Sequence, residues 1–144
     1  MTNEKYAQMV KIRSKSSPIV KNCIKAFCIG GLICTVGQGI LELYQTVGLD
    51  EETAKTLCSV TLIFIGVLLT ALHQYERIAK HGGAGTLVPI TGFANAMSAP
   101  AIEFKAEGWI TGLAAKMFII AGPVLVYGTS AAMLYGVVYY FMTL

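Results

Sequence analysis

The residues best suited to chemistry lie in one apolar stretch, GAGTLVPITGFANAMSAPAIEF, which runs from Gly83 to Phe104. Hydroxyl and amide groups occur in it without any charge before Glu103, which suits the lining of a polar pathway rather than bond breaking. Proline and glycine damage a continuous helix here, because proline lacks an N–H and obstructs the carbonyl one turn earlier. The candidates for lining a pathway are Gly85, Pro89, Thr91, Gly92, Asn95, Ser98 and Pro100.

This pattern predicts two half-helices, about 87–97 and 99–106, with Ser98 as the cap of the second. Interrupted backbone is tolerated at membrane depth only where protein or water satisfies its polar groups. We therefore expect the segment to line a wet space or to be enclosed by partners. The alternative is a kinked, well-packed helix, since glycine, proline and serine are common in membrane helices. Lys105 and Lys116 favour re-entry over crossing, because re-entry keeps them with the other basic residues.

The composition is that of a membrane protein. Of 144 residues, 55% are hydrophobic and only 13% are charged, where about 25% charged is usual for soluble domains. We predict an all-α integral membrane protein with three to four membrane segments, the third broken or re-entrant. Residues 1–22 form a basic amphipathic N-terminal segment, and 23–144 form the membrane domain. The expected spans are about 24–44, 57–75, the broken segment 86–106, and 117–142.

The charges predict the orientation. Six Lys and Arg residues and only one acidic residue precede Ala26, whereas the connection after the first span carries Asp50, Glu51 and Glu52 against Lys55. The positive-inside rule therefore places the N-terminus in the cytoplasm.

Polar and small residues on the outer spans add further candidates. Gln38 and Glu42 can line a pathway; alternatively, Glu42 lies within a turn of the outer boundary and reaches headgroup water there. Small residues spaced four apart let helices approach closely in lipid. The predicted helix-packing residues are Gly31, Thr35 and Gly39 in the first span, and Gly128, Ala132 and Gly136 in the last.

The sequence holds no pattern for catalysis or for cofactors. The GGAGT turn does not fit the dinucleotide or P-loop motifs, and no catalytic signature is present. The four cysteines, without C-x-x-C spacing, are expected to be buried thiols. His73, Glu76 and Arg77 share one side of a continued helix and read as an interfacial ion-pair cluster. We expect neither an enzyme nor a metal, cofactor or nucleic-acid site.

Residues His81 to Gly112, followed by KMFIIAGPVLVYG, carry a resemblance. The pieces GAG, VP, TGFANA, AIEFK and AGPV occur in this order, and together they resemble the family of stage V sporulation membrane proteins AC and AE (b form). The length and the basic N-terminal extension are closer to the AC members. The similarity covers about Ser16 to the C-terminus.

The resemblance implies a hetero-oligomeric channel in the spore (forespore) inner membrane. Such a channel moves dipicolinic acid, a small anionic solute usually carried as its calcium chelate, during sporulation and germination, and opening by membrane tension is the gate proposed for AC proteins. The implied partners are the sister AE subunit, the soluble, thiolase-like AD protein that binds dipicolinate, and membrane lipid. The alternative is a non-conducting scaffold that packs with channel subunits and recruits a soluble partner.

Overall fold

The structure is a computed structural model that describes residues 5–6, 9–10 and 17–143. Every element in the described part of the chain is helical, as predicted for an all-α protein. The predicted amphipathic helix within 1–22 lies largely outside the described residues; the short stretches 5–6 and 9–10 are helical.

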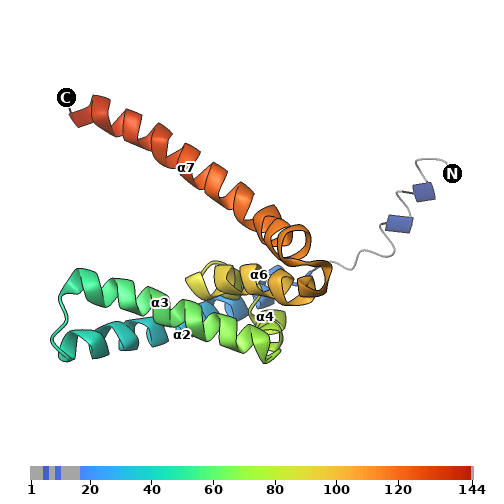
Figure 1. The fold of residues 1–144 in the computed structure, drawn as a ribbon, viewed down its shortest axis with the longest axis horizontal. Helices are drawn as coiled ribbons and strands as arrows, with labels where there is room; N and C mark the ends of the chain where they lie inside the picture. Colours follow the sequence, from blue (N-terminus) through green and yellow to red (C-terminus); the bar gives the residue numbers. More distant parts are fainter. Residues whose placement is uncertain (1–4, 7–8, 11–16, 144) are drawn as a thin grey trace.

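Helices α2 (Ile19–Thr46) and α3 (Glu51–Ala71) form an antiparallel hairpin (Figure 1). Gly48, at φ 94°, terminates α2 in the left-handed conformation that glycine adopts without strain. Asp50 caps α3 by accepting a hydrogen bond of 3.0 Å from the Thr53 N–H, and this bond lowers the pKa of Asp50 below its ordinary value. The two helices pack closely at Cys58, whose thiol donates to the Gly37 carbonyl at 3.3 Å.

Helix α3 ends at Ala71, so the helix stops four residues before Tyr75, the predicted end of this span. His73 adopts φ 55°, and the N–H groups of His73 and Gln74 bond back to the carbonyls of Thr70 and Leu69 at 2.9 Å each. These two bonds form a Schellman motif, which satisfies carbonyls that the helix end would leave free. His73 therefore lies in a turn, and the predicted shared helical side of His73, Glu76 and Arg77 does not exist.

Three short helices follow: α4 (Tyr75–Gly82), α5 (Ala84–Leu87) and α6 (Ile90–Glu103). Helix α5 packs on α2, and α6 packs on α3. Thr91 lies against Gly66, and Asn95 lies against Thr70, so α6 runs parallel to α3 and returns to the end where α3 stops. At 14 residues, about 21 Å, α6 is too short to cross a hydrocarbon core of about 30 Å. We call residues 75–103 the re-entrant hairpin, because the chain leaves the end of the bundle where α3 stops and returns to that same end.

The break in this segment is not where the sequence predicted it. Val88 and Pro89 separate α5 from α6, and α6 then continues through Pro100, so the prediction of two half-helices capped by Ser98 is wrong. The Ser98 hydroxyl instead donates to the Ala94 carbonyl inside α6 at 2.8 Å. Ala96 and Pro100 are only partly buried, so the carbonyl that Pro100 leaves without an N–H partner is not sealed in an apolar core.

The chain then turns through η1 (Lys105–Glu107) and the π-helix η2 (Trp109–Ala114) into α7 (Ala115–Thr143). The Lys116 ammonium lies 4.2 Å from the centre of the Phe104 ring and joins the start of α7 to the end of α6. Beyond this junction α7 leaves the bundle and runs back toward the level of the α2–α3 turn (Figure 1). Helices α2 and α3 and the stretch Trp109–Thr143 are long and apolar enough to span a membrane.

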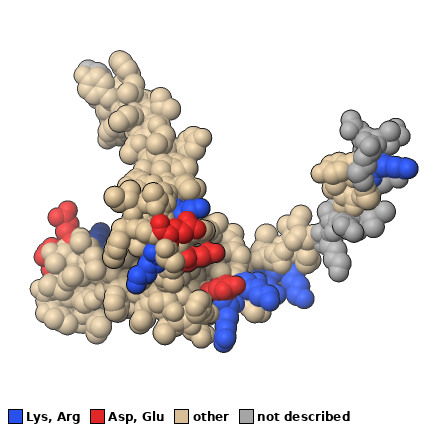
Figure 2. Space-filling model, turned by 45° about the vertical axis from the view of Figure 1, so that its right-hand side comes forward, with Lys and Arg blue, Asp and Glu red and all other residues tan. Residues whose placement is uncertain are grey.

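Charged side chains gather at two ends of the bundle, with a large uncharged surface between them (Figure 2). The end at the α2–α3 turn carries Asp50, Glu51 and Glu52, with Lys55 paired to Glu51 at 2.5 Å; we call it the acidic end. The opposite end, where α2 begins and α3 and α6 finish, we call the basic end. It carries Lys21, Lys25, Arg77, Lys80, Lys105 and Lys116, together with Glu76, Glu103 and Glu107.

The prediction that the cysteines are buried is wrong for three of the four. Cys23, Cys28 and Cys34 are exposed along α2, and only Cys58 is buried, at the α2–α3 contact. The prediction failed because α2 has neighbours on one side only. The sequence shows that a helix is apolar, but not which of its sides a neighbour covers.

Candidate functional site

The interior of the re-entrant hairpin is built around the Tyr75 side chain, which is only 3% exposed. Its hydroxyl donates to the Thr86 carbonyl at 2.7 Å and lies 3.2 Å from the Thr91 hydroxyl. Thr86 and Thr91 are themselves buried, and the Thr86 hydroxyl donates to the Gly83 carbonyl at 2.9 Å. The cluster thus satisfies polar groups that the break at Val88 and Pro89 exposes in an apolar region.

Two glycines let the hairpin close. A Cβ on Gly92 would lie 2.8 Å from the Leu87 carbonyl carbon and closer still to the carbonyl oxygens of Thr86 and Leu87. Gly85 faces α2, where a Cβ on Gly30 would lie 3.1 Å from the Gly85 carbonyl oxygen. Both residues were predicted to line a pathway, and the structure places both against backbone.

A cleft of about 440 Å³ opens beside this cluster, between the end of α3, α4 and α6. Its polar lining is Thr70, His73, Glu76, Asn95 and Glu103. The volume falls within the range of about 300–1,000 Å³ for small-molecule sites. The carboxylates lie toward the basic end, whereas Thr70 and Asn95 lie deeper.

Thr70 and Asn95 form the inner wall of the cleft. Thr70 Oγ1 lies 2.9 Å from Asn95 Oδ1 and 2.7 Å from the Gly66 carbonyl oxygen. Thr70 is buried, while Asn95 is partly exposed to the cleft, so part of its amide can still bond to water or solute there. Asn95 is thus a predicted pathway residue that lines this cleft.

The other predicted pathway residues occupy different places. Pro89 forms the bend before α6, Thr91 and Gly92 are buried in the hairpin, and Ser98 and Pro100 are partly buried on α6. Gln38 and Glu42 lie exposed on α2 toward the acidic end, where the Gln38 amide donates to Glu42 Oε1 at 3.1 Å. They form a second polar surface away from the cleft.

Within the described residues, the predicted packing positions face open space. A Cβ added to Gly31, Gly39, Gly128 or Gly136 would meet nothing within 4 Å, and Thr35 and Ala132 are exposed. Their role in helix packing stays a prediction, and it now concerns contacts with other chains. On α2 and α3, the close approaches occur instead at Gly30, Gly37 and Gly66.

Several residues of the site were not singled out by the sequence. The sequence placed Tyr75 only at the end of an expected span, and Glu103 only as the first charge in the apolar stretch. A usable signal was present in the spacing: Gly66 and Thr70 on α3 match Thr91 and Asn95 on α6, each four residues apart. Parallel helices with that spacing present one face to each other. Among the described residues, no group of three or more His, Cys, Asp and Glu is placed to hold a metal ion.

Comparison with known proteins identifies the family of this chain. The family model described as SpoVAC/SpoVAEB sporulation membrane protein matches residues 22–138. The chain belongs to this family.

The match to the SpoVAC/SpoVAEB family covers the α2–α3 hairpin, the re-entrant hairpin with its cleft and most of α7. The chain is 45% identical over 141 residues to stage V sporulation protein AC of Bacillus subtilis (strain 168), covering 96% of this chain and 94% of that protein. No solved structure matches. The chain is therefore a sporulation membrane protein built from α-helices.

Proposed function

We propose that this chain is a subunit of a channel in the spore inner membrane that moves dipicolinic acid during sporulation and germination. Its role is transport rather than catalysis. The proposal rests on the membership of the SpoVAC/SpoVAEB family and on the resemblance of residues 81–112 to proteins of that kind. Membrane tension as the opening stimulus, and a sister subunit and a soluble dipicolinate-binding protein as partners, belong to the same proposal.

The observation that carries the proposal is the cleft lined by Asn95 at the re-entrant hairpin. When a segment turns back within a membrane, its free backbone N–H and C=O groups must form hydrogen bonds with protein or with water. Here the buried hydroxyls of Tyr75, Thr86 and Thr91 provide hydrogen bonds inside the protein, while the Asn95 amide faces an open cleft. Discontinuous helices near membrane depth are where transport proteins bind their solutes.

The charges at the two ends of the bundle support an orientation with the N-terminus in the cytoplasm. Six Lys and Arg residues of the described chain lie at the basic end, and Lys55 lies at the acidic end. The positive-inside rule puts the basic end, and with it the N-terminus and the mouth of the cleft, in the cytoplasm of the spore.

The charges at the mouth favour one form of the solute. Glu76 and Glu103 line the cleft, and carboxylates repel a dianion within a few ångströms. We therefore propose that the neutral calcium chelate, rather than free dipicolinate, enters at this cleft. Gln38 and Glu42 are exposed toward the other end, where further subunits would complete the path.

The test is flux from proteoliposomes that contain this protein and its sister subunit. Asn95→Leu removes the amide from the cleft and keeps the number and branching of the side-chain heavy atoms, and we expect calcium dipicolinate efflux to fall about two- to tenfold, the equivalent of one lost hydrogen bond. Thr129→Leu makes a comparable change at an exposed position on α7 and should leave efflux unchanged.

Unchanged efflux in Asn95→Leu, with the protein folded and incorporated, would exclude the cleft as part of the path. The scaffold alternative would then gain support, because it predicts no dependence on Asn95. Deleting the turn at 81–85 cannot separate the two functions, since Gly82 and Gly85 pack against α2 and the hairpin would be lost with them.

A further inference from the structure

Where α2 begins, two adjoining hollows share Ser17 and Ile19. One hollow, of about 720 Å³, is lined by apolar side chains together with Lys21 and Lys25. The other, of about 470 Å³, lies between α2 and the α4–α5 turn and is lined by Asn22, Lys80 and His81 among others. We call the two together the α2 entry site.

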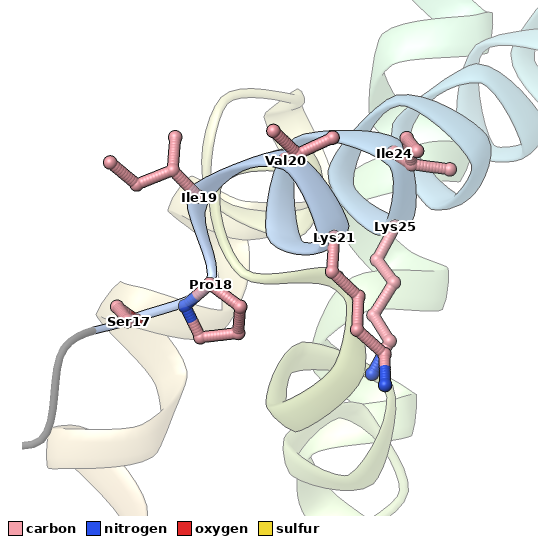
Figure 3. Close-up of a pocket in the computed structure, with 7 residues that line it drawn as sticks. All are labelled: Ser17, Pro18, Ile19, Val20, Lys21, Ile24 and Lys25. Carbon is pink, nitrogen blue, oxygen red and sulfur yellow. The ribbon is translucent and has the colours of Figure 1, made fainter.

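The first turns of α2 separate charge from apolar surface. Figure 3 shows Lys21 and Lys25 leaving the helix on one side, whereas Val20 and Ile24 leave it on another. Lysines four residues apart are neighbours on a helix face. Val20 is 73% exposed and Ile24 60% exposed, so the described part of the chain leaves both open.

None of the described carboxylates forms an ion pair with the cations of this region. The ion pair found in the described part of the chain is Lys55–Glu51, at the opposite end of the bundle. Lys21, Lys25 and Lys80 therefore bring three positive charges to one place at the end of a membrane span, with Glu76 as the nearby acid on α4. Hydrogen bonds order the polar wall: the Asn22 amide donates to Ser17 Oγ at 3.1 Å, and His81 Nδ1 donates to the Arg77 carbonyl at 2.9 Å.

We propose that the α2 entry site binds the headgroup of an acidic phospholipid, with one acyl chain lying along Val20 and Ile24. A phospholipid supplies a phosphate for the lysines and an apolar chain for the exposed aliphatic side chains at the same depth. An acidic peptide or a small free anion would match the charge and leave the apolar hollow uncovered. Basic pockets beside membrane helices are known sites of this kind.

Tryptophan quenching by brominated lipids tests the site. The one native tryptophan is replaced (Trp109→Phe) and a reporter is placed in the apolar hollow (Val20→Trp). Bilayers then contain brominated phosphatidylglycerol in unlabelled phosphatidylcholine, or the reverse. We expect the acidic lipid to occupy the site about fivefold more strongly than the zwitterionic lipid, and Lys25→Gln to remove most of that preference.

Lys105→Gln is the matched control, because Lys105 lies at the basic end but outside both hollows. It should leave the preference unchanged. Equal quenching by both lipids, or an equal loss in Lys25→Gln and Lys105→Gln, would overturn the proposal in favour of diffuse surface charge. Loss of the acidic-lipid preference when phosphate replaces chloride at constant ionic strength would assign the site to a small anion instead. None of these readouts depends on conduction, so the result is independent of the proposed channel function.

Discussion

Gly85 contacts the backbone of Ala26 with no room for a side chain between α5 and α2. A Cβ on Gly85 would lie 2.9 Å from Ala26 Cα and closer still to its carbonyl oxygen. The obstacle is helix backbone, which cannot rotate away as a flexible side chain can. The re-entrant hairpin can therefore pack this closely against α2 only because residue 85 has no Cβ.

Gly85→Ala should weaken this contact. The overlap requires α5 to move away from α2, and overpacking of this kind costs about 1–3 kcal/mol or more. We expect a lower apparent melting temperature in detergent, measured as the fraction that remains monodisperse after heating. Because α5 carries the Thr86 carbonyl that Tyr75 binds, the hydroxyl cluster should loosen as well.

Gly31→Ala is the matched control for Gly85→Ala. Gly31 also lies on α2, five residues after Ala26, but a Cβ there would meet nothing within 4 Å. Alanine is favoured over glycine inside a helix by up to about 1 kcal/mol, so this variant should be as stable as the native chain or more so. Equal stability of the two variants would show that the close α5–α2 contact does not hold in the folded protein.

Tyr75→Phe removes only the hydroxyl oxygen of this side chain and should destabilise the protein. It leaves the buried Thr86 carbonyl without the donor that now lies at 2.7 Å, and an unsatisfied buried group costs about 1–3 kcal/mol. The same heating assay measures the effect. Tyr139→Phe removes a hydroxyl from an exposed position on α7 and should change nothing; a similar loss in both variants would contradict the special role of Tyr75.

The sequence predicted the class of the fold and the existence of a break, but not where the break lies. The sequence alone does not distinguish Pro89 from Pro100, yet Pro89 is the N-cap residue of α6 and Pro100 lies inside that helix. Glycine was equally ambiguous: Gly85 and Gly92 signal either an open path or a close backbone contact, and only the helix opposite decides which. Asn95 was found because an amide in an apolar stretch is costly unless something polar meets it, and Thr70 does.

Single cysteines in a cysteine-free background should report the course of the re-entrant hairpin. Because α6 returns to the end where α3 stops, Glu107→Cys should react with an impermeant thiol reagent from the same side as Lys21→Cys. Thr143→Cys, at the far end of α7, should react from the opposite side. Labelling of Glu107→Cys and Lys21→Cys from opposite sides would mean that residues 83–104 cross the membrane.

Glu42 offers a test of the path at the acidic end, and this test rests on the proposed channel. Its carboxylate is exposed on α2 and held by the Gln38 amide at 3.1 Å. If solute passes this face, the charge repels dipicolinate dianion by about 1 kcal/mol per unit charge at 4 Å even in water. In a background of Glu76→Gln and Glu103→Gln, where the cleft no longer repels the dianion, Glu42→Gln should therefore raise efflux of the dianion from proteoliposomes at least about fivefold, while efflux of the neutral calcium chelate stays the same.

Glu52→Gln is the control for Glu42→Gln, because it separates a local effect of the carboxylate from an effect of total surface charge. Glu52 is exposed at the same end of the bundle but lies on α3, away from the face that bears Gln38 and Glu42. Neutralising it changes the surface charge of that end by the same amount. An equal rise in both variants would reduce the effect to general electrostatics, and no rise in Glu42→Gln would place this face of α2 outside the route of the solute. A rise confined to Glu42→Gln and to the dianion requires the solute to pass within a few ångströms of that carboxylate, because surface charges farther away are screened by salt.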